Sequence, residues 1–357
     1  MEWKPYGAAT LVGSMPHRDR LQVISFILEK LKDIPCWPQL PTYQPEQMMN
    51  QYLEGLPGYN PETMGQNIIH TDSTSFDDEL YGFYADYLDV IEGRANILES
   101  RFGLGVESGK TFRLFLEKLS YQGSGQYRAI KGQVVGPFTL LSSLKAPDGR
   151  LLLYDDRMVD VVPKHLALKA LWQATLLGPF CERVIVFFDE PALAGFGSSA
   201  FIGISKEYVQ RLLDELVDIL KPHNVLVGVH VCANTDWSIL LNSRINIINC
   251  DAYNYGDRFC LYIRDIERFL SEGGIVAWGI VPTDDPEKIV REDGISLYER
   301  LLKLLGQYFS DDGIKSLLAQ SIITPSCGCG TLTEAMAERV VELAVDCSKR
   351  IESIFRG

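Results

Sequence analysis

The sequence predicts an α/β protein built as a single (β/α)8 barrel. Eight short β-branched runs recur along the chain, and amphipathic helical stretches separate most of them. The runs that we interpret as strands are residues 9–14, 34–40, 132–136, 184–188, 226–231, 245–250, 275–280 and 321–324. Eight βα units in 357 residues fit such a TIM barrel, where catalytic groups lie at the C-terminal strand ends. A doubly wound α/β sheet is the alternative fold.

Helical periodicity is clearest in the second half of the chain. Residues 206–221 carry apolar side chains at three- and four-residue spacing, and Ser205 before them is a favourable N-cap. Residues 297–309 and 333–355 have the same pattern. These helices alternate with the expected strands, which is the order of a βα barrel.

Residues 41–131 break this rhythm. The stretch is rich in aromatic residues, Gly, Pro and Asn, and it falls between the second and third expected strands. We interpret it as a long insertion after the second strand, with helices over 77–88 and 111–121, that lies over one end of the barrel. No repeat or low-complexity linker divides the chain, so residues 1–357 are expected to form one domain.

The composition is that of a soluble globular protein, with 46% hydrophobic and 23% charged residues. A net charge of −13 argues against binding to nucleic acid or to an anionic membrane. No apolar run approaches the roughly 20 residues that span a bilayer. The N-terminal sequence lacks the pattern of a signal peptide, so we expect a cytoplasmic protein.

Two Cys/His clusters predict a metal site. His230 and Cys232 end the run LVGVHVC, and residues two apart on a strand point to the same face. Cys327 and Cys329 follow the last expected strand in a turn with Gly328, where the backbone can bend sharply. Each cluster alone is compatible with buried core side chains. Because the strand ends meet at one mouth, we favour a single site whose nitrogen and sulfur ligands suit zinc.

A fourth ligand is expected from the run INIINCDAY, in which Cys250 precedes Asp251. Neighbours on a strand point to opposite faces, so at most one of the two side chains faces the interior. Either a thiolate or a carboxylate would complete a tetrahedral zinc site. In the alternative interpretation, Cys250 is a core residue and Asp251 caps the next turn.

Polar groups follow two other expected strands. Asp189 and Glu190 end the run VIVFFDE, where carboxylates can hold a substrate ammonium group or move protons. We favour this role over a salt bridge to Arg183 or a helix cap. Gly13 and Ser14 form a turn whose hydroxyl and amides would suit a substrate carboxylate, although an ordinary turn has the same sequence.

Five motifs together resemble a known family. VGSMP, GPFT, FFDEPAL, HVC and TPSCG occur in the order, and at about the spacing, of the catalytic C-terminal half of cobalamin-independent methionine synthase. The resemblance covers nearly the whole chain. HVCANT and the PSCG turn also resemble the methylcobamide:coenzyme M methyltransferases. Both groups belong to a superfamily with uroporphyrinogen decarboxylase.

The resemblance implies a zinc site and gives its ligands. His230 and Cys232 match the His-x-Cys ligands of the family, and Cys327 matches its late cysteine ligand. The acidic ligand falls on Asp251, where the family has Glu. This shorter side chain keeps Cys250 as the alternative, and the resemblance assigns no role to Cys329.

The resemblance also implies how homocysteine binds. Asp189 matches the acid that holds the homocysteine amino group and is the expected catalytic residue, with Glu190 beside it. Ser14 and Gly13 lie in the segment that binds the homocysteine carboxylate.

The implied reaction is methylation of a zinc-bound thiolate, with homocysteine converted to methionine. The long enzymes of the family use an N-terminal barrel to help bind methyltetrahydrofolate, and this sequence has no such half. We therefore expect the methyl donor to be a corrinoid, free or held by a partner protein, rather than a folate.

Two alternative functions remain. The protein could be a coenzyme M-type methyltransferase that acts on another thiol, or a non-catalytic subunit that binds a corrinoid protein. The cysteine ligands disfavour a porphyrinogen-type decarboxylase.

Overall fold

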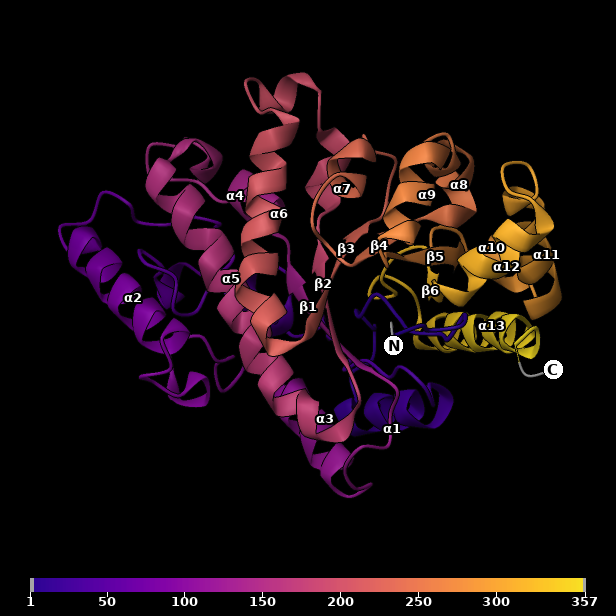
Figure 1. Cartoon of the computed structure of the whole chain (residues 1–357). Helices are drawn as coiled ribbons and strands as arrows, with labels where there is room; N and C mark the ends of the chain where they lie inside the picture. The colour runs from indigo at the N-terminus through magenta and orange to yellow at the C-terminus, as the bar shows by residue number, and fades with distance from the viewer. Residues whose placement is uncertain (1–2, 356–357) are drawn as a thin grey trace.

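The computed structural model describes residues 3–355 and has one curled sheet of six parallel strands (Figure 1). The strands are β1 Ile130–Val135, β2 Val184–Asp189, β3 Val225–Val231, β4 Ile247–Cys250, β5 Ile275–Val281 and β6 Ser321–Pro325. They correspond to the last six strands expected from the sequence. Each strand pairs with the next one along the chain, which contradicts the doubly wound alternative, since its strand order reverses.

The first two expected strands form only isolated bridges, so the structure has six regular strands where the sequence predicted eight. Three parallel bridges connect these segments with each other and with the sheet: Ala9–Ile323 of β6, Ser14–Gln39, and Cys36–Lys131 of β1. Through these bridges, the two N-terminal segments connect the edge strand β6 with the other edge strand, β1. Two features prevent a regular ladder here. Pro35 and Pro38 have no N–H to donate, and Gly13 has a φ of +145°.

Buried apolar side chains form two separate clusters. The larger one lies between the sheet and the surrounding helices. The smaller one fills the inside of the curled sheet: Ala8, Ile34, Ala129, Ile185, Phe187, Ile247, Ile275, Ala277 and Ile322. Its members come from both N-terminal segments as well as from the sheet, so these parts enclose one filled interior.

The interior becomes polar toward the C-terminal ends of the strands. Inward side chains alternate with outward ones along each strand. The next inward positions are buried polar residues: Lys131, Gln133, Asp189, His230, Asn249 and Thr324. This polar tier forms the floor of the candidate site.

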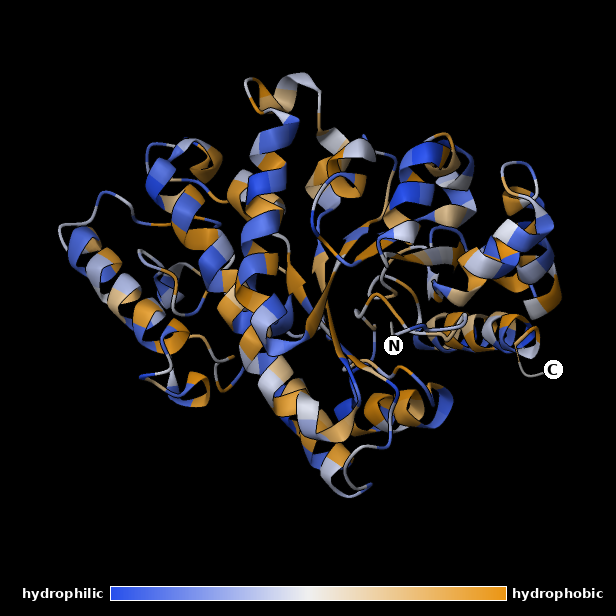
Figure 2. Ribbon diagram, in the orientation of Figure 1, coloured by the Kyte–Doolittle hydropathy of each residue, from blue (hydrophilic) through white to orange (hydrophobic). Residues whose placement is uncertain are grey.

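Helices cover the outside of the sheet (Figure 1). They are α1 Arg20–Lys30, α2 Phe76–Ile91, α3 Lys110–Ser120, α4 Pro137–Ser143, α5 Asp156–Leu177, α6 Lys206–Leu220, α7 Ser238–Leu241, α8 Ala252–Cys260, α9 Ile263–Ser271, α10 Pro286–Arg291, α11 Gly294–Leu305, α12 Asp311–Ala319 and α13 Glu334–Ser353. The helices expected over 206–221, 297–309 and 333–355 are confirmed as α6, α11 and α13. Figure 2 shows that α6 turns a hydrophilic face outward. None of these helices is long and apolar enough to cross a membrane.

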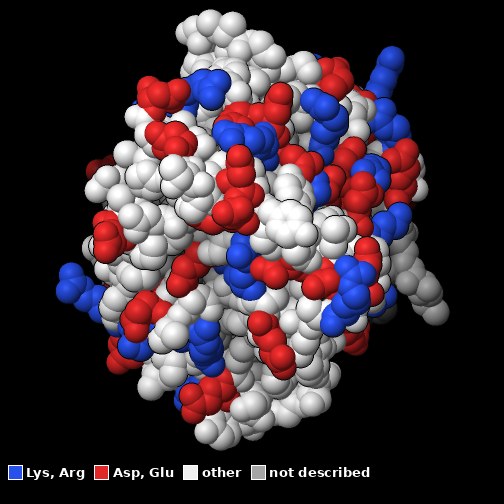
Figure 3. Space-filling model, turned by 90° about the vertical axis from the view of Figure 1, so that its left-hand side faces the viewer, with Lys and Arg blue, Asp and Glu red and all other residues white. Residues whose placement is uncertain are grey.

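The segment between residue 41 and β1 contains α2 and α3, which correspond to the two helices expected there. α3 packs against α1, whereas α2 lies farther out. The face that includes α2 carries acidic and basic side chains side by side (Figure 3). Tyr52 fixes the segment to the barrel, because its hydroxyl donates to Gln133 O of β1 over 2.7 Å. Pro41, Thr42 and Met48 reach the cavity described below.

Candidate metal centre

His230, Cys232 and Cys327 come together at the C-terminal ends of β3 and β6. One imidazole nitrogen and the two sulfur atoms lie within 4.8 Å of one another. His230 points inward near the end of β3, Cys232 follows that strand, and Cys327 lies in the turn after β6. Two segments almost a hundred residues apart thus supply one group of nitrogen and sulfur donors.

The donor atoms fit a zinc ion. His230 Nδ1 lies 2.7 Å from Asn249 Oδ1, whereas His230 Nε2 is buried and has no hydrogen-bond partner. Buried polar atoms in native proteins are nearly always paired, so this nitrogen beside two sulfurs is suited to coordinate a metal ion. Imidazole nitrogen and cysteine sulfur are the donors that zinc prefers.

The two cysteine sulfurs influence each other's ionisation. The neighbouring Cys327 thiol and His230 imidazole lower the pKa of Cys232 to about 4, although burial opposes this shift. The same contact, together with burial, raises the pKa of Cys327. The pair thus favours ionisation of Cys232 over Cys327, and a bound cation would favour ionisation of both thiols.

Cys250 is the last residue of β4, and Asp251 follows it as the N-cap of α8. Cys250 belongs to the outer core, and burial raises its pKa well above the usual value. The carboxylate of Asp251 accepts hydrogen bonds from the backbone and side-chain nitrogens of Asn254, each at 2.9 Å, and so caps α8. Within residues 3–355, the group of close metal-ligating atoms contains neither residue. In the structure, Cys250 is thus a core residue, and the side chain of Asp251 forms hydrogen bonds with the start of α8.

A cavity of about 500 Å³ opens onto the three donors. Val12, Met48 and Pro191 give it apolar walls. Asp189 is the one carboxylate in its lining, and no Lys or Arg of the described chain lines it. The cavity therefore offers a negative group beside the metal donors, without a cationic side chain.

Asp189 presents an unpaired oxygen to this site. The residue is 7% exposed, and its Oδ1 is buried without a hydrogen-bond partner. Burial raises the pKa of Asp189 to about 6, while the nearby His230 and Lys131 oppose the shift. Such a carboxylate is suited to bind a positively charged group of a ligand.

Glu190 has a different environment from Asp189. Its carboxylate accepts hydrogen bonds from Phe138 N at 2.9 Å, Thr139 N at 2.7 Å and Thr139 Oγ1 at 2.6 Å. These donors form the start of α4, so Glu190 caps that helix and does not line the cavity. The structure thus supports the helix-cap interpretation for this residue.

We predict that Glu190→Gln lowers the free energy of unfolding by about 1–3 kcal/mol, because the amide has one acceptor oxygen where the carboxylate has two. Urea denaturation followed by circular dichroism measures this change. Affinity for substrate should stay at the wild-type value. A variant of normal stability that loses substrate affinity would contradict the capping role.

Ser14 holds the cysteine turn. Its carbonyl oxygen accepts a hydrogen bond from Cys329 N at 2.9 Å, and its hydroxyl accepts one from Gly330 N at 3.3 Å. A Cβ atom at Gly328 would overlap this hydroxyl. Ser14 also lines the cavity, whereas Gly13 packs against Gln133. Cys329 is buried, which raises its pKa to about 12, and it is not among the close donors.

Gln39 also lines the cavity, and no motif in the sequence predicts this position. Its Nε2 donates to Gln51 Oε1 at 2.6 Å, and Gln51 Nε2 donates to Ser108 O at 2.6 Å. A backbone carbonyl can only accept, so the NH2 group of Gln51 faces Ser108 and its Oε1 faces Gln39. Gln39 then donates through Nε2, and its Oε1 remains as an acceptor. The cavity thus has a second acceptor. Its position depends on residues far along the chain, so no local motif could reveal it.

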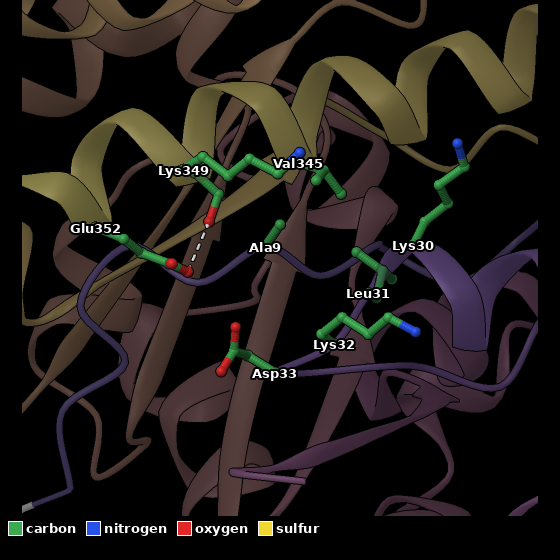
Figure 4. A pocket seen from close by; sticks show the side chains of 9 residues that line it. Ala9, Lys30, Leu31, Lys32, Asp33, Val345, Lys349 and Glu352 are labelled. Atoms are coloured by element: carbon green, nitrogen blue, oxygen red, sulfur yellow. Dashed lines mark hydrogen bonds between the residues drawn. The ribbon is translucent and has the colours of Figure 1, made fainter.

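A second cavity, of about 280 Å³, lies between the end of α1 and α13 (Figure 4). The carboxylates of Asp33 and Glu352 point toward the same space there, whereas the amino group of Lys30 points away. Lys30 pairs instead with Glu342 at 3.1 Å. None of the three metal donors lines this cavity, so it is separate from the candidate site.

No protein-family model and no curated protein matches the sequence. Many solved structures resemble the chain, among them the following three. A putative vitamin-B12 independent methionine synthase from Listeria monocytogenes has 12% identity and a TM-score of 0.53, over 95% of this chain and 86% of that one. A B12-independent methionine synthase from Shewanella sp. W3-18-1, in complex with selenomethionine, has 18% identity and a TM-score of 0.48, over 68% and 67%. A methyltransferase from Methanosarcina mazei has 12% identity and a TM-score of 0.48, over 100% and 95%. The chain thus shares the α/β fold of the Listeria structure over nearly its whole length.

Proposed function

We propose that this protein is a zinc-dependent methyltransferase that methylates the sulfur of homocysteine to give methionine. The observation that carries the proposal is the group of His230, Cys232 and Cys327 at the wall of a cavity that also contains Asp189. Zinc held by these three residues would deprotonate a coordinating thiol and so supply a nucleophilic sulfur at neutral pH. Three protein ligands are typical of catalytic zinc sites, which keep one position for substrate.

The polar groups of the cavity support an acceptor that carries an ammonium group. Asp189 and Gln39 both offer acceptor oxygens, and no cationic side chain of residues 3–355 lines the cavity. This arrangement favours homocysteine over coenzyme M, whose sulfonate would face Asp189 without a compensating cation. The hydroxyls of Ser14 and Thr331 line the same cavity and can donate to the homocysteine carboxylate.

The apolar walls support chemistry at sulfur. Val12, Met48 and Pro191 give the cavity a largely apolar surface that can pack against the methylene groups of the substrate. Such a surface excludes water from the site. A thiolate without a hydration shell keeps its nucleophilicity. For the methyl donor we propose a corrinoid, free or bound to a partner protein. This choice rests on the sequence resemblance to the methylcobamide-dependent enzymes.

The test is to incubate the zinc-loaded protein with methylcobalamin that carries a ¹³C-methyl group and with equal concentrations of homocysteine and coenzyme M. Mass spectrometry should find the label in methionine, and Cys327→Ser should form none. Labelled methyl-coenzyme M as the sole product would overturn the homocysteine assignment. Methylation of homocysteine by methyltetrahydrofolate, but not by methylcobalamin, would overturn the corrinoid assignment.

A further inference from the structure

Asn249 of β4 is a fully buried polar side chain whose backbone pairs in register with His230 of β3. Side chains at paired positions of neighbouring strands point to the same face of a sheet, so both face the interior. The Asn249 amide and the His230 imidazole meet there with 2.7 Å between Oδ1 and Nδ1.

The hydrogen bonds of Asn249 fix the orientation of its amide. Its Nδ2 donates to Ala277 O of β5 and to Thr324 Oγ1 of β6, each at 2.8 Å. A backbone carbonyl accepts and never donates, so the NH2 end must face β5. The end that faces His230 is therefore an oxygen, which can only accept.

This orientation determines the proton position on His230. An acceptor at 2.7 Å requires a proton on Nδ1. A neutral imidazole carries one N–H, so the lone pair lies on Nε2. Nε2 is the buried atom without a partner, beside Cys232 and Cys327.

The same amide connects the two strands that supply the donors. His230 and Cys232 belong to β3 and the residue after it, and Thr324 lies on β6, which leads into Cys327. Asn249 contacts both, and it also contacts β5 between them. A single side chain thus ties His230 to the strand that carries the remote cysteine.

We propose that Asn249 is a positioning residue, which holds His230 in the Nδ1–H tautomer and so keeps Nε2 free to bind the metal. The proposal rests on the zinc-dependent function proposed above. Without this acceptor, His230 would populate both tautomers, and Nε2 would be free in only part of the molecules. Loss of such a partner of a ligating histidine typically weakens metal affinity by about 10–100-fold.

The first test needs no substitution and no metal. Two-bond ¹H–¹⁵N correlation spectra of the metal-free, histidine-labelled protein, at a pH at which the imidazole is neutral, report the tautomer of each ring. His230, assigned by comparison with His230→Gln, should show the Nδ1–H pattern. An Nε2–H pattern in the wild-type protein would overturn the proposal, even if the protein binds zinc.

Variants provide the second test. Asn249→Ala should show mixed tautomers and an affinity for zinc about 10–100-fold below wild type in chelator competition. Asn249→Asp keeps an acceptor toward Nδ1, so it should retain the Nδ1–H pattern although it cannot donate to Ala277 O. Thr324→Val removes only one anchor of the amide and should keep the tautomer. Asn249→Ala with a pure Nδ1–H pattern and wild-type zinc affinity would overturn the proposal. Failure of the wild-type protein to bind zinc would instead overturn the proposed function.

Discussion

Replacing Cys327 with serine is expected to abolish stoichiometric zinc binding. The variant keeps the size of the side chain, but a serine hydroxyl does not ionise at neutral pH and is a poor donor to zinc. Cys327 contributes one of the three close donors within residues 3–355. Its loss should therefore weaken zinc binding by more than the roughly 10–100-fold caused by losing a residue that only supports a ligand. Cys232→Ser should behave in the same way. Elemental analysis of the purified variants and competition with a chelator measure the change.

Cys329→Ser is the matched control for this experiment. Cys329 lies in the same turn, two residues after Cys327, but it is buried and is not among the close donors. Its serine variant should be less stable and should still bind one zinc per chain. Full zinc content in both Cys232→Ser and Cys327→Ser would contradict the assignment of the site.

Asp189→Asn is expected to weaken homocysteine binding by about ten- to a hundredfold. A hydrogen bond to a charged group contributes about 1.5–3 kcal/mol, and each 1.4 kcal/mol corresponds to about a factor of ten. Asparagine keeps the shape of the side chain but removes its charge and one of its two acceptor oxygens. Zinc content should remain at the wild-type value, since Asp189 is not one of the close donors. Calorimetry with the zinc-loaded protein measures the affinity.

Two comparisons make this result specific. Binding of a thiol that lacks an amino group, such as coenzyme M, should not weaken in Asp189→Asn. Glu190→Gln removes the neighbouring carboxylate, which caps α4, and should leave homocysteine affinity unchanged. Wild-type homocysteine affinity in Asp189→Asn would contradict the ammonium-binding role while leaving the zinc assignment intact.

The sequence predicted those features that depend on local periodicity. Alternation along β3 places His230 and Cys232 on one side, and the structure brings both to Cys327. The same alternation predicts that at most one of Cys250 and Asp251 faces the interior, and in the structure Cys250 lies in the outer core. It does not show where the carboxylate of Asp251 points, because that depends on Asn254 at the start of the next helix.

Other features depend on contacts between distant segments, which local patterns do not contain. The sequence places Glu190 beside Asp189, but the hydrogen-bond partners of Glu190, Phe138 and Thr139, lie about fifty residues earlier. Gln39 faces the cavity only because Gln51 and Ser108 orient its amide.

The first two strands could not be judged from apolar content alone. Residues 9–14 and 34–40 have the composition of strands, yet they pair through isolated bridges. Pro35 and Pro38 remove backbone donors from the second segment, and the positive φ of Gly13 interrupts the first. Proline content was the available signal that the second segment would be irregular.

The central claim is that His230, Cys232 and Cys327 hold zinc where a thiol substrate is activated. X-ray absorption at the zinc edge, on the zinc-loaded protein with and without homocysteine, tests it most directly. We predict scattering from one histidine nitrogen and two cysteine sulfurs, and one additional sulfur after homocysteine is added. Loss of one sulfur contribution in Cys327→Ser would identify its source. A spectrum without sulfur scattering, or one that homocysteine leaves unchanged although calorimetry shows it bound, would contradict the account.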